Sequence, residues 1–129
     1  MEKRKLGFDG PNVSAISLGC MSFAGNYGNA LKSECFECLD MANDLGINFL
    51  DTAELYGKGY SEKLIGEYQF SRKRKFHIAT KGGIIVGGKR GENDNSEKAL
   101  RRSLEGSLRR LRVEYVELYY IHRRDFSIE

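Results

Sequence analysis

Residues 33–51 read SECFECLDMANDLGINFLD, and this stretch joins an amphipathic helix directly to a short apolar strand. The helix is expected over Ser33–Leu45, with Ser33 as its N-cap and Gly46 at the left-handed position that ends many helices. A buried strand, Ile47–Leu50, follows, with Asp51 at its end. The apolar side chains of the helix recur at three- and four-residue spacing on one face: Cys35, Cys38, Leu39, Ala42 and Leu45.

The same alternation of helix and strand extends along the chain in both directions. Short apolar strands that alternate with amphipathic helices are typical of parallel sheets, and both a doubly wound sheet and a (β/α)8 barrel fit this order. The expected elements before residue 33 are a hairpin of Lys3–Leu6 and Val13–Ile16 and a short strand that ends at Leu18–Gly19. Those after residue 51 are a helix from near Ser61, a strand at Phe76–Thr80, a helix over about Ser96–Leu111 and a strand at Val116–Ile121.

Three successive strands end in an ionisable residue, namely Asp51, Lys81 and His122. One such residue would carry little weight, because strands often end in polar residues where the chain reaches the surface. Three in phase favour the barrel, in which the carboxyl ends of all strands converge on one face. We therefore predict a parallel (β/α)8 TIM-barrel type of α/β fold, of which residues 1–129 supply the N-terminal hairpin and about four βα units of one domain.

The composition is that of a globular chain of 129 residues, 40% of them hydrophobic and 30% charged. A net charge of +3 is too small for a nucleic-acid protein, and no apolar run approaches the roughly 18–20 residues of a membrane-spanning helix. An odd number of cysteines, three, and a basic start without an apolar signal segment favour a reducing compartment. We expect a cytoplasmic protein that binds neither nucleic acid nor membranes.

Three further patterns have structural interpretations. Cys35 and Cys38 have C-x-x-C spacing, but their place on the apolar helix face favours core packing. With His77 and His122 as the two histidines, no metal-ligand cluster is evident, and we expect no metal site. The arginines near the last helix alternate with glutamates, which predicts a solvated helix face: Arg101, Arg102, Arg109, Arg110 and Arg112.

Two sequence motifs, and a lysine at the end of a predicted strand, indicate a protein family. Residues 46–57 read GINFLDTAELYG, residues 119–125 read YYIHRRD, and Lys81 directly follows a strand. With these residues, and with the hairpin and the loop after Leu18–Gly19, the whole chain resembles the aldo-keto reductase family. The resemblance implies an NAD(P)H-dependent oxidoreductase that reduces aldehydes or ketones, with a catalytic tetrad of Asp51, Tyr56, Lys81 and His122.

The implied roles suit the chemistry of carbonyl reduction. Hydride delivery leaves negative charge on the carbonyl oxygen, so Tyr56 would donate a proton as general acid. Lys81 would stabilise the phenolate, Asp51 would anchor Lys81, and His122 would orient the substrate carbonyl. A purely structural alternative places Tyr56 as a packing residue on the barrel rim and makes Asp51 and Lys81 an ordinary ion pair.

The resemblance also implies a cofactor site. Gly19, Cys20 and Met21 occupy the loop where family members line the nicotinamide, together with Asp51, although Cys20 and Met21 could equally well be packing residues. NADPH is favoured over NADH as the cofactor, with a small-molecule carbonyl compound as substrate. The segments that would distinguish the two cofactors are not among these residues.

The length departs from the family pattern, since a (β/α)8 barrel needs about 250 residues. We expect either the front portion of a longer enzyme or a half-barrel that associates with another chain, because four strands leave two open edges. The alternative function is a truncated half-barrel without independent catalysis that acts as a binding, regulatory or assembly-dependent fragment.

Overall fold

The computed structural model describes residues 1–89 and 91–128 and contains a four-stranded parallel sheet. Each strand pairs with the next one along the chain, as in the wall of a βα barrel, so the predicted parallel order is confirmed. The strands, in their order across the sheet, are β3 (Leu18–Gly19), β4 (Phe49–Asp51), β5 (His77–Gly82) and β6 (Leu118–Ile121).

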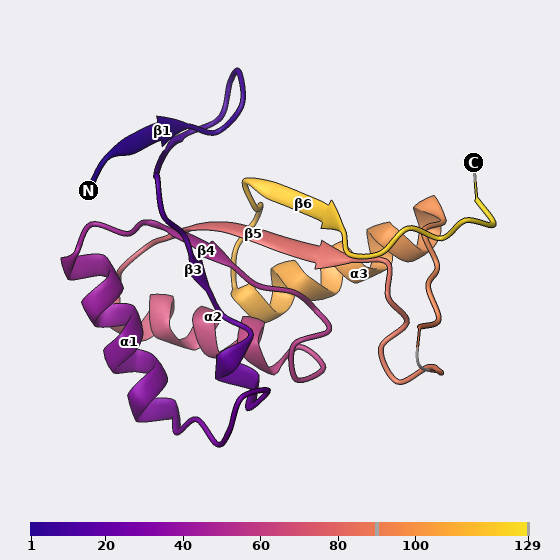
Figure 1. Ribbon diagram of the computed structural model, residues 1–129, viewed down its shortest axis with the longest axis horizontal. Coiled ribbons are helices and arrows are strands. Elements are labelled where there is room, and N and C mark those ends of the chain that lie inside the picture. The colour runs from indigo at the N-terminus through magenta and orange to yellow at the C-terminus, as the bar shows by residue number, and fades with distance from the viewer. Residues whose placement is uncertain (90, 129) are drawn as a thin grey trace.

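Three helices lie on one side of this sheet (Figure 1). They are α1 (Lys32–Asp44), α2 (Tyr60–Arg72) and α3 (Glu97–Leu111). Apolar side chains from the helices and from β4 and β5 form the core between the two layers, and the larger ones are Leu39, Leu50, Ile65, Tyr68, Ile78 and Leu111. Burial of this apolar surface holds the helices against the sheet and leaves the carboxyl ends of the strands at one edge of the molecule.

The N-terminal hairpin pairs β1 (Lys3–Lys5) with β2 (Asn12–Ser14), as predicted. Asn48, just before β4, fastens it to the sheet, because its side-chain oxygen accepts a hydrogen bond from Ser14 N at 2.6 Å. In return, the Ser14 hydroxyl accepts a hydrogen bond from Asn48 N at 3.1 Å. A short 3₁₀ turn, η1 (Ser22–Ala24), follows β3.

The first helix differs from its sequence prediction in two respects. It begins at Lys32, and the Glu34 carboxylate accepts the N–H of Leu31 at 2.9 Å, so the predicted N-cap Ser33 lies inside the first turn. Its buried strip is also narrower than predicted, because Cys38 and Leu45 are exposed. The physical reason is that α1 faces the core through Cys35, Leu39 and Ala42, while its neighbouring side chains Phe36 and Asp40 contact Tyr68 of α2.

The later helices and the open edge of the sheet follow the sequence more closely. α2 begins one residue before Ser61, and Ser96 caps α3 by accepting the N–H of Ala99 at 3.3 Å. The edge strand β6 exposes Tyr120 and Ile121, as expected for an incomplete barrel. Within the described part of the chain, none of the helices has the length and apolar character needed to cross a membrane.

Candidate active site

A loop of residues 52–59 connects β4 to α2 and carries Tyr56 over the carboxyl end of β5. Its backbone is held to that strand, because Thr52 N donates to Ala79 O at 2.9 Å and Glu54 N donates to Lys81 O at 3.3 Å. The loop then turns through Gly57, whose φ of 61° disfavours other residues and where a Cβ would lie 2.9 Å from the Tyr60 Cβ. The sequence D-T-A-E-L-Y-G therefore fixes the direction of the tyrosine.

Lys81 is the centre of the site. Its ammonium donates to Asp51 Oδ1 at 2.5 Å, to Thr52 O at 2.9 Å and to the Tyr56 hydroxyl oxygen at 3.2 Å. An ammonium has three N–H donors, so all of them are engaged. The side chain of Lys81 is 15% exposed and that of Asp51 is 34% exposed, so the pair lies at the edge of the core rather than in open solvent.

The Tyr56 hydroxyl accepts a hydrogen bond from Lys81, and a phenol O–H can also donate one. The Lys81 ammonium also lies 5.0 Å from the centre of the Tyr56 ring. No residue of the described ranges accepts the phenol proton. A molecule bound above the loop could therefore receive that proton, while the adjacent cation would stabilise the phenolate left behind.

His122 lies beside the phenol at the end of β6. The two rings meet edge to face, with centroids 5.8 Å apart and planes at 88°, and His122 N donates to Gly82 O at 2.8 Å. Burial lowers the pKa of His122 below its ordinary value, and the positive charges of Lys81 and Arg123 lower it further against the opposing effect of Asp51. The imidazole is thus neutral at neutral pH and can donate one hydrogen bond without competing as an acid.

The three loop residues predicted to line a cofactor, Gly19, Cys20 and Met21, differ in how far they are exposed. Gly19 is exposed, pairs in register with Asp51, and has no heavy atom within 4 Å of the position of a Cβ, so open space adjoins the site there. Met21 is half-buried. Cys20 is fully buried in the core, and its N–H and carbonyl bond to Asp51 O at 2.8 Å and to the Ser61 hydroxyl at 2.9 Å.

The thiol of Cys20 therefore faces the core rather than the open space at Gly19. Burial raises its pKa, which keeps it in the uncharged thiol form. The orphaned Nδ1 of His122 is a more informative atom, since it is buried without a hydrogen-bond partner among the described residues. A buried polar atom of this kind normally meets an ordered water or another polar group, because most buried polar atoms in proteins have a hydrogen-bond partner.

Sequence reasoning missed a second polar cluster on the helix side of the loop. Arg110 was expected on a solvated helix face, but it turns inward and pairs with Glu54 and with the fully buried Glu62. The spacing of Ser103, Ser107 and Arg110 along one side of α3 is the signal that could have found it, because small hydroxyl residues leave room for a guanidinium. The other four arginines of the predicted set are exposed.

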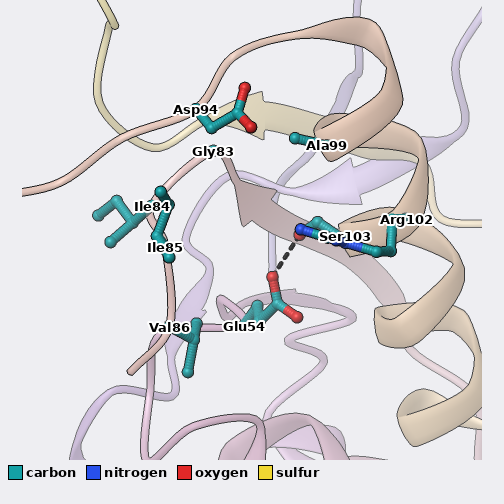
Figure 2. Close-up of a pocket in the computed structure, with 9 residues that line it drawn as sticks. All are labelled: Glu54, Gly83, Ile84, Ile85, Val86, Asp94, Ala99, Arg102 and Ser103. Atoms are coloured by element: carbon teal, nitrogen blue, oxygen red, sulfur yellow. Dashed lines mark hydrogen bonds between the residues drawn. The ribbon is translucent and has the colours of Figure 1, made fainter. Parts of the chain in front are cut away.

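Figure 2 shows the outer end of this cluster, with the Ser103 hydroxyl bonded to Glu54. A small cavity of about 170 Å³ lies beside them, between α3 and the loop after β5. Gly83 and Ile84 line the side of the cavity that belongs to this loop. The cavity faces the helix layer, and neither Tyr56 nor Lys81 lines it.

Comparison with known proteins gives the same family as the sequence motifs and the fold. The chain belongs to the aldo/keto reductase family, whose family model matches residues 15–129. The structure is accordingly part of a (β/α)8 barrel: it superimposes on the holo form of the aldo-keto reductase AKR11C1 from Bacillus halodurans with a TM-score of 0.83 and 34% identity, covering 99% of this chain and 42% of that one.

Relatives named as oxidoreductases align over nearly the whole chain. The uncharacterized oxidoreductase YqkF of Bacillus subtilis is 36% identical over 124 residues, which is 95% of this chain and 39% of the relative. The aldo-keto reductase yakc [NADP(+)] of Schizosaccharomyces pombe is 36% identical over 93% of this chain and 36% of its own length. The glycerol dehydrogenase AKR11B4 of Gluconobacter oxydans has a TM-score of 0.81 at 32% identity, covering 97% of this chain and 40% of that one. The chain therefore spans less than half the length of these proteins.

Proposed function

We propose that this chain carries the proton-donating half of an NAD(P)H-dependent oxidoreductase that reduces aldehydes or ketones to alcohols. The observation that carries the proposal is the contact of one ammonium, Lys81, with both Asp51 and the hydroxyl oxygen of Tyr56. This arrangement leaves the phenol proton available to an incoming oxygen. Residues 1–129 are then the N-terminal part of one barrel domain, and the three free cysteines support a cytoplasmic location.

Each member of the tetrad has a role that its contacts support. Tyr56 donates its proton to the carbonyl oxygen as negative charge develops there, and Lys81 stabilises the resulting phenolate. Asp51 holds the ammonium at the tyrosine, where an unpaired cation would be unstable. The neutral imidazole of His122 orients the substrate oxygen by a hydrogen bond.

A nicotinamide cofactor would supply the hydride when bound. The open space at Gly19, with Met21 and Asp51 beside it, is where we propose that the nicotinamide end is held, and Cys20 contributes only by fixing the loop. We favour NADPH over NADH, because the relative from Schizosaccharomyces pombe carries NADP(+) in its name.

Substitution of Tyr56 by Phe tests the proposal directly. The variant keeps the ring against His122 and removes the proton donor, so we expect carbonyl reduction to fall by about 100-fold or more while NADPH binding is unchanged. Carbonyl reduction by residues 1–129 is measured from the consumption of NADPH, and NADPH binding is measured from the fluorescence of the cofactor. Tyr115→Phe is the matched control, since Tyr115 is exposed far from the site. Full activity of the Tyr56→Phe variant would show that Tyr56 is not the general acid.

A second candidate function is a half-barrel without independent catalysis that works only after assembly. It is favoured by the exposed side chains of Tyr120 and Ile121, which are 40% and 55% exposed on the edge strand β6. Light scattering at increasing concentration tests it, and Ile121→Lys should reduce the apparent mass if the edge pairs. A chain that stays monomeric at high concentration and turns over NADPH would exclude this alternative.

A further inference from the structure

A partly buried polar cluster lies directly behind the loop that carries Tyr56, on the side of the helices. It is centred on Arg110 of α3 and is called the Arg110 cluster below. It draws its members from four separate segments of the chain: Glu54, Glu62, Thr80, Ser103 and Arg110.

The guanidinium of Arg110 holds two carboxylates at once. Its Nε donates to Glu62 Oε2 at 2.7 Å, and its Nη2 donates to Glu54 Oε1 at 3.1 Å. Glu62 is 0% exposed, so removal of its partner would leave a charge in the core. The planar fork of arginine presents donors in two directions, which a lysine ammonium on the same helix could not reproduce.

The two carboxylates lead to the two sides of the candidate active site. Glu54 lies two residues before Tyr56 in the loop, and its second oxygen accepts the Ser103 hydroxyl. Glu62 accepts the Thr80 hydroxyl at 2.6 Å, and Thr80 immediately precedes Lys81 on β5. Arg110 is therefore linked to the segment that carries the phenol and to the strand that carries the ammonium.

The packing around Arg110 leaves the cluster little freedom. A Cβ placed at Gly59, where the loop enters α2, would lie 2.5 Å from the Cδ of Arg110. Gly66 of α2 lies equally close to α3, since a Cβ there would be 2.3 Å from the Arg110 carbonyl oxygen. The arginine is thus wedged between the loop and the two helices, and the loop cannot shift without disturbing these contacts.

We propose that Arg110 is a positioning residue that sets the separation of the Tyr56 hydroxyl and the Lys81 ammonium. The guanidinium fixes the loop through Glu54 and the end of β5 through Glu62 and Thr80, so the 3.2 Å contact between phenol and ammonium depends on it. Its relevance to catalysis rests on the proposed function, whereas the geometric claim can be measured without cofactor or substrate. Arg110 itself contacts neither Tyr56 nor Lys81 through any described hydrogen bond.

Chemical labelling of Lys81 measures this separation. The ammonium is shielded by Asp51 and Tyr56, so we expect its acetylation by acetic anhydride to be slow in the wild-type chain. Mass spectrometry compares it with acetylation of the exposed Lys63 in the same sample. In Arg110→Met we expect acetylation of Lys81 to rise by about tenfold or more relative to Lys63, as for the loss of one hydrogen bond to a charged group. Arg110→Lys should give an intermediate rise, because a single ammonium holds one carboxylate.

Arg109→Met is the matched control, since Arg109 is the exposed neighbour on the same helix. It should leave the labelling of Lys81 unchanged. A purely structural arginine would give a different result: Arg110→Met would unfold at lower urea concentration, yet Lys81 would be labelled at the wild-type rate in native buffer. That result would overturn the proposal.

A second variant decides the matter if Arg110→Met does not fold. Glu54→Gln leaves the buried pair of Arg110 and Glu62 intact and weakens only the link to the loop. Faster acetylation of Lys81 in Glu54→Gln supports the positioning role, and an unchanged rate overturns it. The labelling can respond as expected although the wild-type chain reduces no carbonyl compound. That result would support the positioning role of Arg110 and contradict the proposed oxidoreductase function.

Discussion

Two charged clusters lie on opposite sides of the loop 52–59. Both contain a cation that is bonded to a carboxylate, but they differ in what else the cation contacts. In the Lys81 cluster (Asp51, Tyr56 and Lys81), a cation is shared between a carboxylate that is 34% exposed and a phenol. In the Arg110 cluster, a cation is shared between two carboxylates, of which Glu62 is wholly buried. The first cluster borders open space at Gly19, and the second lies between the loop, α2 and α3, where Arg110 is 27% exposed and Glu54 is 21% exposed.

The difference lies in which hydrogen-bonding groups remain free. Lys81 uses all three of its donors, but the phenol proton of Tyr56 has no acceptor within the described residues. In the Arg110 cluster, both oxygens of Glu54 and both oxygens of Glu62 accept bonds inside the protein. A cluster with a free phenol proton can react with a ligand, whereas carboxylates whose oxygens all accept bonds inside the protein serve to hold their neighbours in place.

The largest effect on stability is expected from Glu62→Ala. This change leaves Arg110 and Thr80 without their buried partner, and loss of one member of a buried ion pair costs about 3 kcal/mol or more. Urea denaturation followed by circular dichroism measures the free energy of unfolding. Glu105→Ala, at an exposed position of α3, is the control and should change it by less than about 0.5 kcal/mol. Equal losses in the two variants would show that the Arg110 cluster contributes no special stability.

The strand ends were the part of the structure that the sequence determined best. Asp51 is the last residue of β4 and Lys81 the last but one of β5, and the parallel sheet brings them into contact at 2.5 Å. His122 follows β6 in the same phase and reaches the ring of Tyr56. These positions were predictable because strand period and sheet order alone decide which residues share an edge.

The Arg110 cluster could not be predicted in the same way. Its members lie on two helices, a loop and a strand, and their contact depends on how α2 and α3 pack together. The alternation of arginine and glutamate along α3 does not distinguish an arginine that faces solvent from one that turns inward. The exposure of Cys38 has a similar cause, because the width of the buried strip on α1 is set by the elements that pack against it and not by its own sequence.

Asp51→Asn should separate function from stability. Because the pair with Lys81 is partly open to solvent, we expect the free energy of unfolding to fall by only about 1 kcal/mol. Acetylation of Lys81 should nevertheless increase, since its charged partner is gone. Asp9→Asn in the exposed hairpin turn is the control for both measurements. A loss of stability as large as that of Glu62→Ala would mean that the two clusters do not differ as argued.

The pH dependence of stability should report the environment of His122. Its pKa in the folded chain is lowered by burial and then by Lys81 and Arg123, so the unfolded chain takes up the proton first as the pH falls. More protons bound to the unfolded state mean that the free energy of unfolding decreases as the pH drops below about 6.5. His122→Asn should flatten this part of the profile, while His77 remains in both proteins. Parallel profiles for the two proteins would contradict the lowered pKa.

The smallest effect is expected from Arg101→Ala, which gives the scale against which both clusters are judged. Arg101 pairs with Glu97 one turn earlier on α3 at 2.8 Å, and both side chains are largely exposed. Such a pair is screened by water and contributes about 0.3 kcal/mol, so the urea midpoint should hardly move. A shift as large as that of Asp51→Asn would mean that exposed charges stabilise this chain as much as the Lys81 cluster does. The distinction between the clusters would then rest on reactivity toward ligands and labels alone.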